Sequence, residues 1–128
     1  MKVEPAPIPG AIAELIERRS QNTTVRDLAT AFAEQASRRD VELVAHVSKE
    51  PRYFRVVWRG ISVAYVQPRP GEVRADYRLP HNHWSYGWGF GQDKGWGEIG
   101  LKINGQASFD VSMRLLDDAI RRAEAEGA

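Results

Sequence analysis

The spacing of apolar side chains changes near residue 40 of the chain. Before that point, apolar residues recur every three to four positions, the period of an α-helix that buries one face. After it, apolar and polar residues alternate, the period of a half-buried β-strand. The last twenty or so residues return to the helical period. This order predicts helices first, strands next and a helix last.

Two helices are predicted before the change of period. Three alternating prolines predict an extended lead-in over residues 1–9, and residues 11–19 follow as a first helix. A second helix is predicted to begin at Thr24, because its hydroxyl and the carboxylate of Asp27 have capping-box spacing. The apolar period then runs through Ala36 with no glycine turn, which excludes a helix-turn-helix motif.

Four strands are predicted between residue 41 and Pro80. Phe54, Val56 and Trp58 should share one face of a strand, with Arg55 and Val57 on the other. Arg59-Gly60 predicts a tight hairpin turn, because glycine readily takes a positive φ. The predicted strands cover residues 41–46, 53–59, 61–66 and 72–79.

Residues 81–97 combine aromatic side chains with glycine. Four rings fall two positions apart, at Trp84, Tyr86, Trp88 and Phe90, with Ser or Gly between them. This spacing predicts a strand over 84–90 with an aromatic ladder on one face. We expect a turn at 92–95 and pairing with a strand over 96–103. The ladder is either buried beneath helices or exposed as a stacking surface.

The predicted fold class is therefore α+β, in a single domain over residues 1–128. We expect a curved antiparallel β-meander of five to six strands, with two N-terminal helices and one C-terminal helix on one face. The C-terminal helix should be capped by Ser108 or Asp110.

Composition narrows the functional classes. The chain has 128 residues, 42% apolar and 27% charged, which is ordinary for a globular domain. It contains no cysteine, which excludes a disulfide scaffold, a thiolate nucleophile, a cysteine-type zinc site and an iron–sulfur cluster. It shows no signal-peptide pattern, and its longest unbroken apolar run, 63–66, is far shorter than a membrane span. A cytoplasmic location and no membrane partner are expected.

The net charge of +1 conceals an uneven distribution. Residues 49–80 carry seven basic side chains, six of them Arg, against three acidic ones, a net charge of +4. Arginine suits planar, bidentate recognition, although its aliphatic stem also covers apolar sheet surface. Three Arg-Arg pairs fall in late helical turns, where cations complement the helix dipole. These pairs are Arg18-Arg19, Arg38-Arg39 and Arg121-Arg122.

The chain offers little for catalysis. His81 and His83 have the only spacing typical of metal ligands, and a third ligand would have to come from elsewhere in the chain. The residues considered for that ligand are His46, Asp76, Asp93 and Glu98. No tight divalent ion is predicted, no cofactor is implied, and the glycine-rich segment lacks the pattern of a phosphate loop. An enzyme is not favoured.

The leading hypothesis is a non-catalytic binding or accessory module that uses an Arg- and aromatic-bearing antiparallel sheet. Its ligand would be nucleic acid or an acidic protein surface. The predicted ligand-binding residues are Arg55, Arg59, Arg74, Arg78, Trp84, Tyr86 and Trp88.

Two other hypotheses stay open. A helix-grip-like container would wrap a curved sheet around the C-terminal helix and hold a small apolar ligand, with Trp84, Trp88 and Trp96 lining the cavity. A His-dependent metal enzyme would bring His81 and His83 together with a carboxylate.

Overall fold

The computed structural model describes residues 8–79, 92–93 and 99–127. The elements in these ranges are α1 (Gly10–Arg19), α2 (Thr23–Ser37), β1 (Glu42–Ala45), β2 (Phe54–Trp58), β3 (Ile61–Pro68), β4 (Val73–Tyr77), β5 (Gln92–Asp93), β6 (Ile99–Ile103) and α3 (Gln106–Gly127). Among these helices, none has the length and apolar character needed to cross a bilayer.

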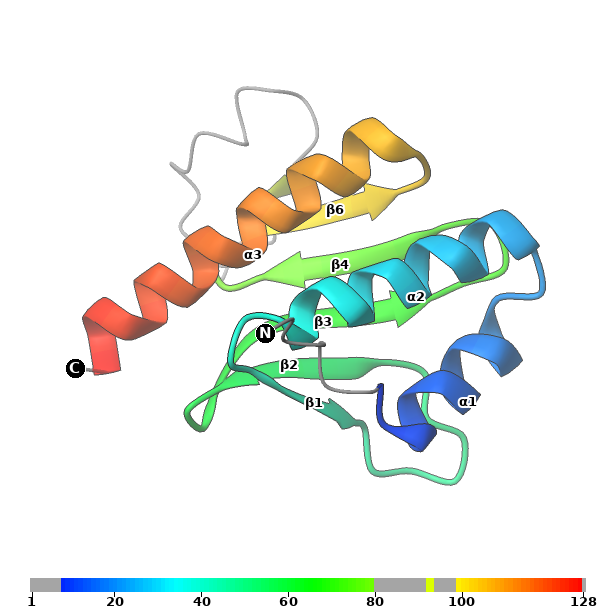
Figure 1. The fold of residues 1–128 in the computed structure, drawn as a ribbon, viewed down its shortest axis with the longest axis horizontal. Coiled ribbons are helices and arrows are strands. Elements are labelled where there is room, and N and C mark those ends of the chain that lie inside the picture. The colour runs from blue at the N-terminus through cyan, green and yellow to red at the C-terminus, as the bar shows by residue number, and fades with distance from the viewer. Residues whose placement is uncertain (1–7, 80–91, 94–98, 128) are drawn as a thin grey trace, which may run out of the picture.

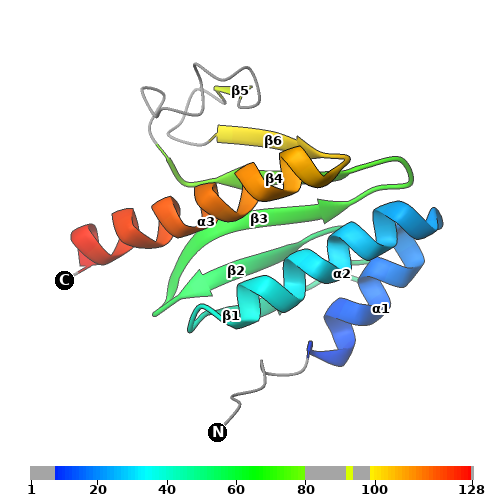
Figure 2. The same cartoon turned by 45° about the horizontal axis from the view of Figure 1, so that its top comes forward.

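The three helices lie on one face of a single antiparallel sheet (Figure 1). α1 and α2 pack together on the β1 side, and α3 crosses β3, β4 and β6 (Figure 2). This arrangement confirms the predicted α+β class and the order of two N-terminal helices and one C-terminal helix. On its other face the sheet carries no helix from the described part of the chain.

The sheet order is β1-β2-β3-β4-β6-β5. The first four strands form a meander, and β6 then lies between β4 and the edge strand β5. Gln92 pairs with Gly100 and Asp93 with Ile99, so the predicted turn at 92–95 is misplaced. Polar residues and glycine suggested a turn there, but an edge strand also tolerates polar residues. The pairing of β5 with β6 extends through Asp93. The predicted strand over 84–90 lies outside the described residues.

The start of α2 differs from the prediction. The helix begins at Thr23, and Oδ1 of Asn22 accepts hydrogen bonds from the backbone N–H groups of Thr24 and Val25, at 2.9 and 3.3 Å. The predicted capping box at Thr24 is therefore wrong. Asn22 has the extended backbone of an N-cap and satisfies two N–H groups at once, which leaves Thr24 inside the first turn.

The turn between β2 and β3 confirms the predicted hairpin. Arg59 and Gly60 both have positive φ, at 45° and 83°, and the flanking residues Trp58 and Ile61 pair directly. Two positive φ values are typical of a type I′ turn, whose twist matches that of the strands. The guanidinium of Arg59 lies 4.8 Å from the ring centroid of Trp58.

α3 begins earlier than predicted, at Gln106. Ser108 lies inside its first turn, and its Oγ reaches back to accept hydrogen bonds from the N–H groups of Asn104 and Gly105, at 3.0 and 3.2 Å. Asp110 is a further two residues into the helix and accepts a hydrogen bond from the Gln106 side chain. Neither residue precedes the helix. Ser108 lies within the first turn and accepts hydrogen bonds from backbone N–H groups just before the helix.

One hydrophobic core fills the space between the helices and the sheet. Its largest fully buried side chains include Tyr77, Phe32, Phe54 and Leu115, contributed by β4, α2, β2 and α3. The rings of Phe32 and Phe54 meet edge to face at 6.5 Å. An ion pair of 2.6 Å between Arg39 Nε and Asp117 Oδ1 joins the end of α2 to α3 above this core.

Candidate functional site

Strand alternation places a second set of side chains on the sheet face turned away from the helices. In β4, Val73, Ala75 and Tyr77 are buried beneath the helices, so Arg74 and Asp76 point the other way. Cross-strand pairs share a face, so the register gives the other members of this helix-free face. Its side chains include those of Arg55, Tyr65, Gln67, Arg74, Asp76 and Lys102, together with Val44, Val57 and Ser62. Tyr53 joins them through its ring contact with Tyr65.

Two rows of side chains run across the helix-free face. In the first row, Tyr65 on β3 pairs with Arg55 on β2 and with Asp76 on β4. In the second, Arg74 pairs with Gln67 on one side and with Lys102 on the other. Tyr65 is thus flanked by one basic and one acidic side chain in its own row, while the two rows together hold three basic side chains and one carboxylate.

Both arginines of these rows make a contact with a neighbouring side chain. Nη1 of Arg55 donates a hydrogen bond to Ser62 Oγ at 3.1 Å. Nε of Arg74 lies 3.8 Å from Oδ1 of Asp76. Each guanidinium keeps further N–H donors, because an arginine carries five of them in a planar fork.

An aromatic row lies at the β1–β3 end of the same face, formed by His46, Tyr53 and Tyr65. The imidazole of His46 stacks on Tyr53 with ring centroids 4.5 Å apart, and Tyr53 meets Tyr65 edge to face at 6.1 Å. The Tyr53 hydroxyl lies 2.8 Å from Nδ1 of His46. Tyr53 and Tyr65 are half-buried and His46 is exposed, so this row presents aromatic surface outside the core.

A shallow recess adjoins the aromatic row. Its volume is about 220 Å³, and it is lined by Tyr53, Tyr65, Gln67 and Asp76. This is smaller than the ~300–1,000 Å³ cavities that enclose drug-sized ligands, so it suits one ring of a ligand lying on the surface. Burial raises the pKa of the Asp76 carboxyl, and the charges of Arg74 and Arg69 offset part of that rise.

The structure brings together only some of the predicted binding residues. Arg55 and Arg74 share the helix-free face. Arg59 lies at the β2–β3 turn with its guanidinium over Trp58. Arg78 follows β4, and its Nη2 pairs with Glu126 of α3 at 3.4 Å. These contacts place Arg59 and Arg78 at the β2–β3 turn and beside α3, apart from Arg55 and Arg74.

The remaining predicted site residues are Trp84, Tyr86, Trp88, His81 and His83, and all lie outside the described residues. Within the described part of the chain, no three metal-ligating side chains come together. The aromatic ladder over residues 84–90 stays a prediction.

Sequence reasoning assigned no binding role to Tyr53 or Tyr65, and it considered His46 only as a third metal ligand. Their signal was available in part, because Tyr53 alternates with the buried Phe54 and shares a face with Arg55. An aromatic residue at an outward strand position, beside an arginine at another, indicates a surface for ligands. That His46 stacks on Tyr53 depends on how the chain returns between β1 and β2.

Comparisons with known proteins give no relatives. No family model matches the chain, and neither the curated proteins nor the solved structures contain a significant match.

Proposed function

We propose that this protein is a non-catalytic binding module that holds single-stranded nucleic acid on its helix-free face. The observation that carries the proposal is the aromatic row of His46, Tyr53 and Tyr65 beside Arg55 and Arg74 on one sheet surface. Bases stack on exposed aromatic rings, while arginines neutralise phosphates, and this combination is typical of proteins that bind single strands.

The spacing of the face supports this proposal. Neighbouring strands lie about 4.8 Å apart, and successive side chains on one face of a strand about 6.8 Å apart. Arg55 and Arg74 stand on the strands that flank Tyr65, so a base on Tyr65 would place its phosphates within reach of guanidinium groups on both sides. The charge of Asp76 opposes an anionic ligand, and Arg74 at 3.8 Å offsets it.

The container hypothesis has less support in the described residues. Core side chains with no exposed surface, including those of Phe32, Phe54 and Leu115, occupy the space between the sheet and the helices. The recess beside Tyr65 lies on the other side of the sheet. A small apolar ligand therefore remains an outcome of the test below.

The test is a fluorescence anisotropy titration with a labelled single-stranded oligonucleotide of mixed sequence, as DNA and as RNA. Tyr65→Ala should weaken binding at every salt concentration, because stacking of one base on a ring contributes roughly 1–3 kcal/mol. The Arg55→Ala and Arg74→Ala variants should each flatten the salt dependence, by about 0.7 log units per log unit of salt.

Arg38→Ala is the matched control. It removes the same charge from the C-terminal end of α2, on the helical side of the sheet, and should leave binding unchanged. No binding at low salt, or equal binding by Tyr65→Ala, Arg55→Ala and the wild type, would contradict the proposal. A poly-glutamate peptide that binds as tightly as the oligonucleotide, with no loss in Tyr65→Ala, would favour the acidic-protein hypothesis instead.

Trp88→Ala tests the aromatic ladder in the same assay. An exposed Trp88 should add a stacking contact, so that the variant binds the oligonucleotide less tightly with an unchanged salt slope. A buried Trp88 predicts instead a loss of roughly 3–5 kcal/mol in the free energy of unfolding. A large drop in the melting temperature of Trp88→Ala, combined with no oligonucleotide binding by the wild type, would favour the container hypothesis.

A further inference from the structure

A second pocket lies beyond the end of the sheet, where α1 ends. Its volume is about 360 Å³, and its charged lining consists of Arg18, Arg19, Arg52 and Glu50. We infer that this pocket binds the dianion of a phosphate monoester, with Arg19 and Arg52 as the contacting residues. Nothing in the proposed function requires this site, because it uses different side chains from the helix-free face.

Three segments that are distant in sequence build the pocket, and hydrogen bonds hold them in place. Nη2 of Arg18 donates to the carbonyl oxygen of Pro51 at 2.6 Å, which ties α1 to the loop before β2. Oγ of the fully buried Ser20 donates to the carbonyl oxygen of Arg69 at 3.0 Å, which ties α1 to the β3–β4 turn. The walls are therefore set by the fold and do not depend on a ligand.

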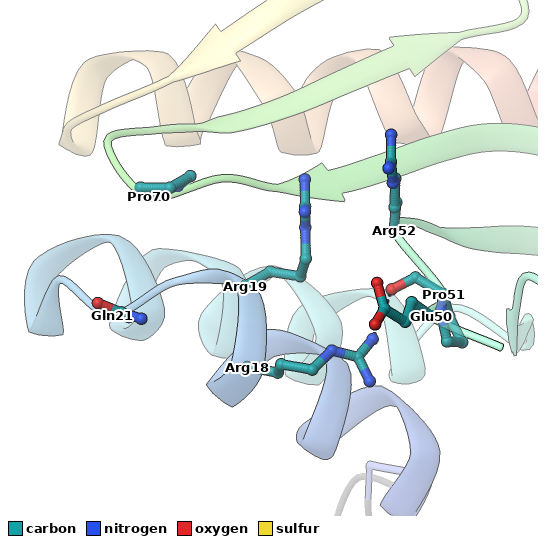
Figure 3. A pocket seen from close by; sticks show the side chains of 7 residues that line it. All are labelled: Arg18, Arg19, Gln21, Glu50, Pro51, Arg52 and Pro70. Atoms are coloured by element: carbon teal, nitrogen blue, oxygen red, sulfur yellow. Dashed lines mark hydrogen bonds between the residues drawn. The ribbon is translucent and has the colours of Figure 1, made fainter.

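The arginines keep donors for a ligand. Arg19 uses Nε for the carbonyl oxygen of Pro68, at 3.4 Å, which leaves its terminal nitrogens unused by that bond. Arg52 is exposed and makes no hydrogen bond or ion pair with any described residue. In Figure 3 the side chains of Arg19 and Arg52 extend in the same direction from two sides of the pocket, and Arg18 points toward Glu50 and Pro51.

The charges match a dianion. Three guanidinium groups and the Glu50 carboxylate give the lining a formal charge of +2. A phosphate monoester carries between −1.5 and −2 charges near neutral pH, with three acceptor oxygens, and guanidinium groups bind such oxygens in a bidentate manner. The volume admits the phosphate together with part of the group that carries it.

The pocket and the helix-free face use neighbouring residues of the chain at two points, which indicates two sources for the phosphate. Arg52 directly precedes Tyr53 of the aromatic row, and Arg69 bridges to Gln67 through a hydrogen bond of 3.1 Å from Nη2 to Oε1. The ligand is thus either a small phosphorylated molecule or the terminal phosphate of a strand lying on the face. The chemistry recognised is the same for both.

The test is an NMR titration of the ¹⁵N-labelled full chain with inorganic phosphate, at constant ionic strength held by sodium chloride. Amide shifts should concentrate at residues 18–21 and at Glu50 and Arg52. Arg52→Ala should weaken phosphate binding about tenfold, as expected for loss of a charged hydrogen bond. Glu50→Gln should strengthen binding severalfold, because it removes the one carboxylate of the lining. Arg38→Ala is the control and should bind phosphate like the wild type.

A second experiment distinguishes a small phosphorylated molecule from the terminal phosphate of a strand. It also distinguishes failure of the phosphate pocket from failure of the proposed function. An oligonucleotide with a 5′- or 3′-phosphate should bind more tightly than its hydroxyl form only if the phosphate comes from a strand end. Phosphate binding that depends on Arg52, without any oligonucleotide binding, would support this site and contradict the proposed function. Shifts scattered over the surface, or equal phosphate affinity in Arg52→Ala and the wild type, would overturn the inference.

Discussion

Tyr77 shows how one polar atom is held inside the core. It extends from β4 toward α3 and is fully buried, and this burial raises the pKa of its hydroxyl. Ser112 lies beside that hydroxyl, but Ser112 Oγ donates its own hydrogen bond to the carbonyl oxygen of Phe109 at 2.5 Å. No described atom completes a hydrogen bond of ordinary geometry with the Tyr77 hydroxyl. Burial of the Tyr77 ring therefore stabilises the folded protein, while desolvation of its hydroxyl lowers this stabilisation.

Tyr77→Phe should raise the free energy of unfolding by about 1 kcal/mol, because it removes the desolvation cost of the hydroxyl and keeps the ring. Urea denaturation of the wild type and the variant measures this change. Tyr65→Phe is the control and should shift stability by less than about 0.5 kcal/mol, since Tyr65 is half-buried on the helix-free face. A clear loss of stability in Tyr77→Phe would show that the hydroxyl is bonded, with Ser112 as its partner.

At the scale of elements, hydrogen bonds at the helix ends decide where the helices begin. α2 begins one residue after Asn22, whose side chain accepts from two backbone N–H groups. α3 begins before Ser108, which satisfies the preceding N–H groups from inside the first turn. For α3 the sequence named Ser108, which bonds at the helix start from inside the first turn. For α2 it named Thr24, whereas Asn22 is the residue that reaches the free N–H groups.

Asn22→Ala should lower the free energy of unfolding by about 1 kcal/mol, since it leaves the N–H groups of Thr24 and Val25 without their acceptor. Thr24→Ala is the matched variant at the position that the sequence favoured. It should leave stability unchanged or slightly raised, because alanine is the better helix former. Thermal unfolding followed by circular dichroism compares the two, and a larger loss in Thr24→Ala would place the cap at Thr24 after all.

At the scale of the whole molecule, the sheet divides apolar from charged side chains. The helices cover the apolar face, while Arg55, Arg74 and Asp76 occupy the other. Asp76 is the carboxylate that this arrangement desolvates, and its pKa is raised above the ordinary value of 3.8. The folded protein therefore binds the Asp76 proton more tightly than the unfolded chain does.

This pKa shift predicts the sign of a pH effect on global stability. As pH rises from 3.8 through the raised pKa of folded Asp76, the unfolded chain loses its proton first, so this group's contribution to stability falls and is at its lowest at neutral pH. Asp76→Asn should therefore be more stable than the wild type at pH 7, and the difference should vanish below pH 3.8.

Urea denaturation between pH 3 and pH 7 measures this difference. Asp27→Asn serves as the control, because it neutralises an exposed carboxylate on α2 and should change stability little at any pH. A gain in Asp76→Asn that is the same at both ends of the range would rule out desolvation of the carboxylate as its cause. Destabilisation at pH 7 would show that the contact with Arg74 outweighs burial.

The sequence by itself determined the features that depend on neighbours along the chain. The 3.6-residue period of α2 and the alternation of β2 and β4 identified the buried faces, because side-chain direction follows from backbone geometry alone. Arg59-Gly60 specified its turn through the positive φ that glycine allows. The α+β class followed from the order of these periods.

Only the tertiary structure decided the features that depend on contacts between distant segments. Strand pairing alone shows that β6 lies between β4 and β5. Arginines that look alike in the sequence have different neighbours in the fold. Arg55 lies beside Tyr65 on the helix-free face, and Arg78 forms an ion pair with Glu126. Arg18 donates a hydrogen bond to the carbonyl oxygen of Pro51. Local pattern fixes which way a side chain points but not what faces it, because the partner comes from elsewhere in the chain. Both candidate sites therefore became visible only once the sheet and the end of α1 were placed together.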